Sequence, residues 1–208
     1  MTGVQTCALP ISVSDIKINN GKLYVVGQFT NIQGSTRNYG ARFSLATGLL
    51  DNWLVGKKIN SYIAAVGFGN GNVIVGGQFT TMNATARNYI AAIDLNQPTY
   101  PLTNWYPNVY WNSFNSLNAF IHNGHDLIFG GDLSYQENGK TVSNLISLDD
   151  STGLITHSLS QYPNGIVRAM SLYNNTLAIG GDFTGFTKVS DASVYNTNAY
   201  LSGYDLNT

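Results

Sequence analysis

A four-residue pattern occurs four times at nearly constant intervals, and this repeat most constrains the fold. It reads Gly-Gln-Phe-Thr or a close variant, and its copies begin at Gly27, Gly77, Gly131 and Gly181, at intervals of 50, 54 and 50 residues. Each copy closes a short apolar run, which is preceded by a turn rich in Asn or Gly and by another apolar stretch. Two apolar runs joined by such a turn predict a β-hairpin. The glycines of the repeat are expected to allow an unusual strand path or a close approach.

The pattern continues downstream of each hairpin. Residues 37–39 match residues 87–89 as Arg-Asn-Tyr, and we expect the two arginines to hold backbone carbonyls or an adjacent unit. An alternating strand follows, then a turn, then Trp53 in the first copy and Trp105 in the second. Four short strands per unit of about 50 residues, without helical periodicity, predict an all-β chain: a β-propeller segment of about four blades, each a four-stranded antiparallel sheet. The expected structural positions of the repeat are Gly27, Gly77, Gly131, Gly181, Phe29, Phe79, Phe183, Trp53 and Trp105.

The chain divides into a short leader and the repeats. Residues 1–11 resemble the translation of a sequencing-adapter oligonucleotide, and we treat them as a non-native leader. They contain Cys7, the only cysteine, so the repeats have no disulfide or thiolate chemistry. Few residues follow Asp205, so the last blade is expected to be incomplete and the chain to be a fragment of a larger ring. The predicted blades are residues 12–56, 57–110, 111–162 and 163–208.

The order of these elements resembles a known class of repeats. An apolar run, Gly-Gly, a Tyr-containing third strand, Asp or Ser, and then Trp is similar to kelch-type repeats. The Gly-Gly-x-Phe-Thr and Arg-Asn-Tyr variants are similar to propeller repeats of large bacterial surface proteins and fungal cortical proteins. The resemblance covers residues 12–208, although the first copy has Val26 in place of the first glycine. It implies a propeller fold, and it leaves activity open because propellers serve both as binding modules and as enzymes.

Composition excludes some partners. Charged residues make up 10% of the chain and the net charge is −1, which argues against a nucleic-acid-binding protein. No apolar run approaches the ~20 residues of a membrane helix, so we expect no membrane span. The favoured function is a non-catalytic binding or scaffold propeller fragment of a larger secreted or cell-surface protein, of bacterial origin. Its expected partners are a protein or glycan ligand and the remaining blades of the parent chain.

An enzyme is the alternative. The chain would then be a fragment of a carbohydrate-active or oxidase propeller enzyme whose catalytic residues lie in missing blades. Within these residues we predict no catalytic group, cofactor or metal site. His122 and His125 lie three residues apart, and with His157 they offer too few convergent ligands for a metal. Asp132 and Asp182 occupy a repeat position that holds Gln in the other copies, which indicates a structural hydrogen bond rather than acid catalysis.

The densest aromatic segment is the candidate ligand site. It runs over residues 105–114, where the spacing between repeats is longest. Aromatic faces next to Asn side chains suit a sugar ring, because the rings contact C–H groups while the amides bond hydroxyls. The alternative is packing, with Trp105 in the repeat core and the other rings wedged between blades. The predicted ligand-binding residues are Tyr106, Tyr110, Trp111 and Phe114.

Overall fold

The computed structural model describes residues 12–107, 109–156, 159–188, 190, 193–196 and 199–206. Every regular element in these ranges is a β-strand, which confirms the predicted all-β class. No described segment is a helix of the length and apolar character needed to cross a membrane. The predicted leader and His157 lie outside the described residues.

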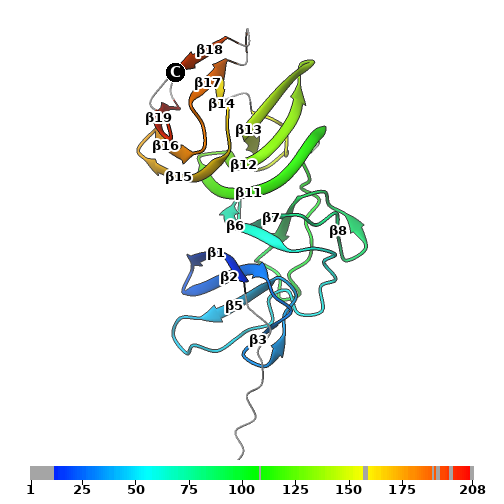
Figure 1. Ribbon diagram of the computed structural model, residues 1–208. Coiled ribbons are helices and arrows are strands. Elements are labelled where there is room, and N and C mark those ends of the chain that lie inside the picture. Colours follow the sequence, from blue (N-terminus) through cyan, green and yellow to red (C-terminus); the bar gives the residue numbers. More distant parts are fainter. Residues whose placement is uncertain are drawn as a thin grey trace, which may run out of the picture.

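Four three-stranded antiparallel sheets contain most of the strands (Figure 1). We number them in chain order. Sheet 1 is β1 (Ser12–Asn19), β2 (Lys22–Gln28) and β5 (Gly40–Ser44), and sheet 2 is β6 (Ile63–Gly69), β7 (Asn72–Gly77) and β10 (Ile90–Asp94). Sheet 3 is β11 (Trp111–Asn123), β12 (Asp126–Glu137) and β13 (Lys140–Asp149), and sheet 4 is β15 (Val167–Tyr173), β16 (Thr176–Gly181) and β19 (Leu201–Asp205).

Smaller elements fill the connections. The small hairpins are β3 (Asn31–Ile32) with β4 (Ser35–Thr36), and β8 (Thr81–Met82) with β9 (Thr85–Ala86), while β14 (Gln161–Pro163), β17 (Gly185–Lys188) and β18 (Val194–Asn196) form a further sheet. The expected fourth strand of each unit is reduced to a single bridge in sheets 1 to 3. These bridges are Phe43 to Leu50, Ile93 to Leu102 and Leu148 to Ile155.

The hairpin turns follow the sequence pattern. Asn20 and Gly21 join β1 to β2 with φ values of 47° and 68°, and Asn70 and Gly71 join β6 to β7 with 47° and 72°. Two successive positive φ values are the requirement of the tight turn whose twist matches the flanking strands, and Asn-Gly meets it at little cost. The predicted hairpins at these turns are therefore confirmed.

The repeat glycines allow a very close approach of two strands. A Cβ atom built on any of the four would lie 2.0 to 2.2 Å from a backbone carbonyl oxygen. That oxygen belongs to the first strand of the same sheet or to the residue just before it. Each first strand shifts its register beside this point, which brings its backbone against the glycine. The glycines concerned are Gly27, Gly77, Gly131 and Gly181.

The sheets follow one another in a series, and their first strands are in contact: β1 with β6, β6 with β11, and β11 with β15. Figure 1 shows the series with sheet 1 at one end and sheet 4 at the other. Side chains alternate between the two faces of each strand, so separate apolar clusters form between consecutive sheets. The repeat aromatics Phe29, Phe79, Phe183, Trp53 and Trp105 are all buried.

A side chain from each of the first three sheets also bonds the backbone of the next sheet. Asp15 Oδ2 accepts the Val66 amide of sheet 2 at 3.0 Å. Gln78, the residue after β7, donates from Nε2 to the Phe114 carbonyl of sheet 3 at 2.9 Å. Asn118 Nδ2 donates to the Val167 carbonyl of sheet 4 at 2.7 Å. We call these three contacts the inter-sheet bonds.

Candidate functional site

Sheet 3 extends beyond the other sheets. The second strands of sheets 1, 2 and 4 end at the repeat glycine or one residue later, whereas β12 continues past Gly131 to Glu137. A tight turn at Asn138 and Gly139, with φ values of 51° and 77°, leads directly into β13. In the first two repeats this part of the chain forms a separate small hairpin instead. We call residues 111–115, 133–137 and 140–143 the third-sheet extension.

One face of the extension is an aromatic cluster against sheet 2. The Phe114 ring stacks on Tyr89 with centroids 4.4 Å apart, and the Trp111 ring meets Phe114 edge to face at 5.1 Å. The centroid of the Trp111 ring also lies 6.1 Å from that of Tyr89 and 6.3 Å from that of Tyr135. Phe114 and Tyr135 are buried, and Trp111 is half-buried. This face therefore packs two of the predicted ligand residues between sheets 2 and 3.

The opposite face of the extension is polar, its own residues there are uncharged, and the Asp132 carboxylate beside it accepts Asn115 Nδ2 at 3.2 Å. Alternation along β12 turns Ser134 and Gln136 away from the aromatic cluster. The Ser134 hydroxyl lies 2.9 Å from that of Ser113, and Gln136 Nε2 donates to Thr141 Oγ1 at 3.0 Å. Asn112 Nδ2 lies 3.5 Å from the same Thr141 oxygen. Hydroxyl and amide groups, each able to donate and accept, thus share one face of the sheet.

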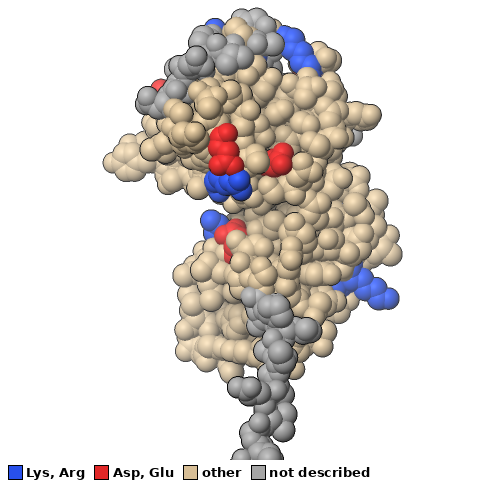
Figure 2. Space-filling view, in the orientation of Figure 1, with Lys and Arg blue, Asp and Glu red and all other residues tan. Residues whose placement is uncertain are grey.

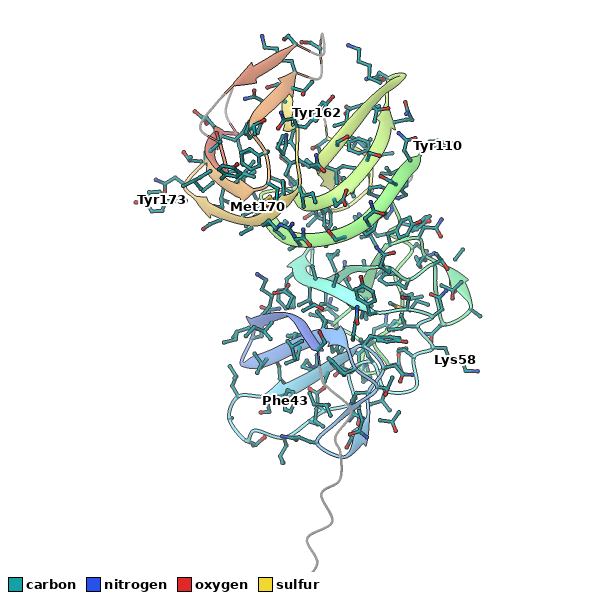
Figure 3. All side chains as sticks on the ribbon, in the orientation of Figure 1. Phe43, Lys58, Tyr110, Tyr162, Met170 and Tyr173 are labelled. Atoms are coloured by element: carbon teal, nitrogen blue, oxygen red, sulfur yellow. The ribbon has the colours of Figure 1, made fainter. Side chains whose placement is uncertain are left out.

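Tyr110 stands at the edge of this polar face. Its carbonyl accepts the backbone amide of Gln136 at 3.0 Å, which continues the pairing of β11 with β12 by one residue. Residues paired in this way share a face of a sheet, so the Tyr110 ring belongs with Gln136. The side chain is 74% exposed, and Figure 3 shows it where β11 begins. An accessible aromatic ring therefore adjoins the hydroxyl and amide groups.

Tyr106 makes its contacts with the loop before β10. The Arg87 guanidinium carbon is 5.1 Å from its ring centroid, and its hydroxyl accepts the Asn88 amide at 3.2 Å. Arg87 donates in addition to the carbonyls of Ala86 and Thr103, both at 2.9 Å. Arg37 does the same in the first repeat, so the expected contacts of both arginines with backbone carbonyls are confirmed.

The titratable groups form small structural contacts. His122 Nε2 and His125 Nδ1 lie 3.1 and 3.2 Å from the two carboxylate oxygens of the buried Asp150. Arg168 pairs with Asp182 on the surface, and this hydrogen bond lowers the pKa of that carboxyl below its ordinary value. Among the described residues no group of three or more His, Cys, Asp or Glu side chains is arranged to hold a metal ion. Figure 2 shows how sparse charged side chains are on the face that it draws.

Comparison with known proteins adds a fold likeness. No family model matches the sequence, and no curated protein matches it. A solved structure of the computationally designed Ika4 protein superposes with a TM-score of 0.54, at 11% identity, over 96% of this chain and 94% of that one. The likeness is one of fold. The computationally designed Ika8 protein aligns with a TM-score of 0.45, at 10% identity, over 91% of this chain and 63% of that one.

The aromatic cluster leads to a stability prediction. Trp111→Ala is expected to lower the free energy of unfolding by about 2 kcal/mol, less than the about 3–5 kcal/mol of a fully buried Trp, because the ring is half-buried among three others. Urea unfolding followed by circular dichroism measures the change. Tyr110→Ala is the control, since removal of an exposed ring leaves the unfolding midpoint in place. An unchanged midpoint for Trp111→Ala, together with lost polysaccharide retention, would favour a ligand platform at Trp111 instead.

Proposed function

We propose that the chain is a segment of a β-propeller and that it serves as a non-catalytic binding scaffold for neutral glycans. The propeller rests on the repeat and on the contacts between consecutive first strands, β1 to β6 to β11 to β15. A sheet with two apolar faces gains stability only between neighbours, as in propeller blades. An extracellular or cell-surface location is part of the proposal, and its support is the low charge and the lack of cysteine in residues 12–208.

The glycan proposal is carried by one observation: the exposed Tyr110 ring adjoins the uncharged polar face of the third-sheet extension. A sugar presents C–H groups on the faces of its ring and hydroxyls around its edge. The tyrosine ring suits the C–H face, and Gln136, Thr141 and Asn112 suit the hydroxyls. A protein ligand usually meets a larger apolar centre than the one tyrosine ring that adjoins these hydroxyl and amide groups.

A glycoside-cleaving function finds less support at this site. Such enzymes use two carboxyl groups on either side of the scissile bond. Within the extension the carboxylate is Glu137, which is buried on the other face with the Tyr135 hydroxyl 3.5 Å away. The neighbouring carboxylate of Asp132 is bonded by Asn115 Nδ2 at 3.2 Å. Burial beside Glu137 also raises the pKa of Tyr135 far above its ordinary value, so this phenol stays protonated. The favoured activity is therefore binding.

The test is affinity electrophoresis through gels that contain a panel of neutral polysaccharides. We expect the wild-type chain to be retarded by at least one of them, and Tyr110→Ala to lose at least about tenfold in affinity, as the loss of a stacked ring implies. Tyr173→Ala is the matched control, because Tyr173 is a 79% exposed tyrosine on sheet 4. Wild-type retention by Tyr110→Ala, or equal loss in Tyr173→Ala, would contradict the assignment.

A further inference from the structure

At the joints of sheets 2 and 3 and of sheets 3 and 4, a bulky side chain of the later sheet lies over a small residue of the earlier one. At the joint of sheets 1 and 2, the rings of Tyr24 and Phe68 meet instead. Phe120 of sheet 3 lies so close over Gly67 of sheet 2 that a Cβ there would be 1.8 Å from the ring. Val167 of sheet 4 lies over Gly130 of sheet 3, where a Cβ would be 2.5 Å from a valine methyl. The last two joints are therefore directional, each with a bulky face and a small-residue face.

Sheet 1 carries the bulky face, and no sheet precedes it among the residues that the structure describes. Ile16 occupies in sheet 1 the position that Phe120 occupies in sheet 3. Ile16 pairs with Val25 and Phe120 pairs with Phe129, and both Val25 and Phe129 lie two residues before a repeat glycine. Val25 belongs to the apolar cluster on the side of sheet 1 that is turned away from sheet 2. Ile16 and Ile18 are 56% and 65% exposed. Two large aliphatic side chains thus stand in solvent at the positions that are packed in sheets 2 to 4.

Sheet 4 carries the complementary small-residue face. Gly180 occupies in sheet 4 the repeat position that Gly130 occupies in sheet 3. In the described part of the chain, the atom nearest to a Cβ built on Gly180 is the Tyr200 carbonyl oxygen, at 3.7 Å. Leu201 pairs with Gly180 and is 63% exposed. Figure 3 shows Tyr173 projecting from this end of the molecule. The small residues that register places on the same face are Ala169, Ser171, Ala178, Gly180 and Gly203.

We propose that copies of this chain associate head to tail, with sheet 1 of one copy packed on sheet 4 of the next. Ile16 and Ile18 would lie over the small residues around Gly180, as Phe120 lies over Gly67. The new joint would continue the order of the last two joints within the chain. A second copy is the occupant that supplies the matching face, whereas two sheet 1 faces would set bulky side chains against each other. Such an interface is heterologous, because different surfaces of the two copies meet.

The first experiment compares two variants of the full chain by analytical ultracentrifugation over a range of concentrations. The wild type is expected to have the mass of two or more copies of the 22.5 kDa chain. The double variant Ile16→Glu/Ile18→Glu blocks sheet 1, and Leu201→Glu blocks sheet 4. Each is expected to weaken association at least about tenfold, because a carboxylate buried without a partner is costly. Leu154→Glu is the control. Leu154 is 59% exposed and follows β13 of sheet 3, so it belongs to neither sheet 1 nor sheet 4.

Mixing the two blocked variants tests the direction of the contact. Each retains one intact face, so an equimolar mixture is expected to form a one-to-one complex although neither variant associates alone. Circular dichroism spectra like that of the wild type establish that both are folded. A monomeric wild type, undiminished association of Leu201→Glu, or a mixture of folded variants that stays monomeric would each overturn the proposal. Glycan retention by the monomeric variants is expected to persist, so the two proposals fail separately.

Discussion

Gly181→Ala is expected to lower the free energy of unfolding by about 3 kcal/mol, whereas Gly180→Ala, one residue earlier on the same strand, leaves it nearly unchanged. A Cβ at Gly181 would lie 2.0 Å from the Ile166 carbonyl oxygen and 3.0 Å from the Val167 Cα. Both contacts are with backbone, which no side-chain rotation can relieve, so β15 and β16 would have to separate. At Gly180 the nearest described atom is 3.7 Å away, an ordinary contact distance.

Urea unfolding at low protein concentration measures both glycine variants without a contribution from association. A midpoint for Gly181→Ala equal to that of Gly180→Ala would mean that the two strands tolerate a wider spacing at the repeat glycine. The same close approach recurs at the other three repeat glycines, so Gly77→Ala provides an independent repetition in sheet 2.

Trp53→Ala is expected to cost about 3–5 kcal/mol, the range for a fully buried aromatic side chain. Trp53 is 0% exposed, and its ring meets that of Tyr24 edge to face at 5.0 Å. Its truncation would leave a cavity in the cluster between sheets 1 and 2. Thermal and urea unfolding both measure the loss.

A conservative variant separates packing from hydrogen bonding at this position. The buried indole N–H of Trp53 has no acceptor among the described residues. Trp53→Phe removes this unsatisfied donor while it keeps most of the ring, so we expect a loss of at most about 2 kcal/mol. Equal losses in the two variants would imply that the N–H makes a contact of its own.

The repeat made much of the fold predictable. Asn-Gly turns and the spacing of the glycines fix the hairpins, because few residues adopt positive φ and only glycine admits a carbonyl oxygen so close. The fourth strand of each unit was harder to predict from the sequence pattern. After the bridge at Leu50 the chain turns inward, where the Asp51 carboxylate accepts the Trp53 amide at 3.0 Å and Arg42 Nε at 2.7 Å. In the first repeat, the burial of Trp53 thus follows directly on the single bridge.

The candidate site was harder to predict than the fold. β11 shifts register against β12 at three places, and each shift changes which face the following side chains occupy. A strict alternation therefore cannot show that Phe114 faces sheet 2 while Tyr110 faces the polar groups. The aromatic segment was found from composition, but its division into a packed part and an exposed part depends on these bulges.

The inter-sheet bonds have a consequence for how such a chain can change over time. In each, the side chain of Asp15, Gln78 or Asn118 bonds a main-chain atom of the following sheet, and every amino acid except proline supplies both kinds of atom. The receiving repeat therefore needs no particular residue at that point. A unit gained by tandem duplication, or exchanged by recombination, could join its neighbour without a compensating mutation.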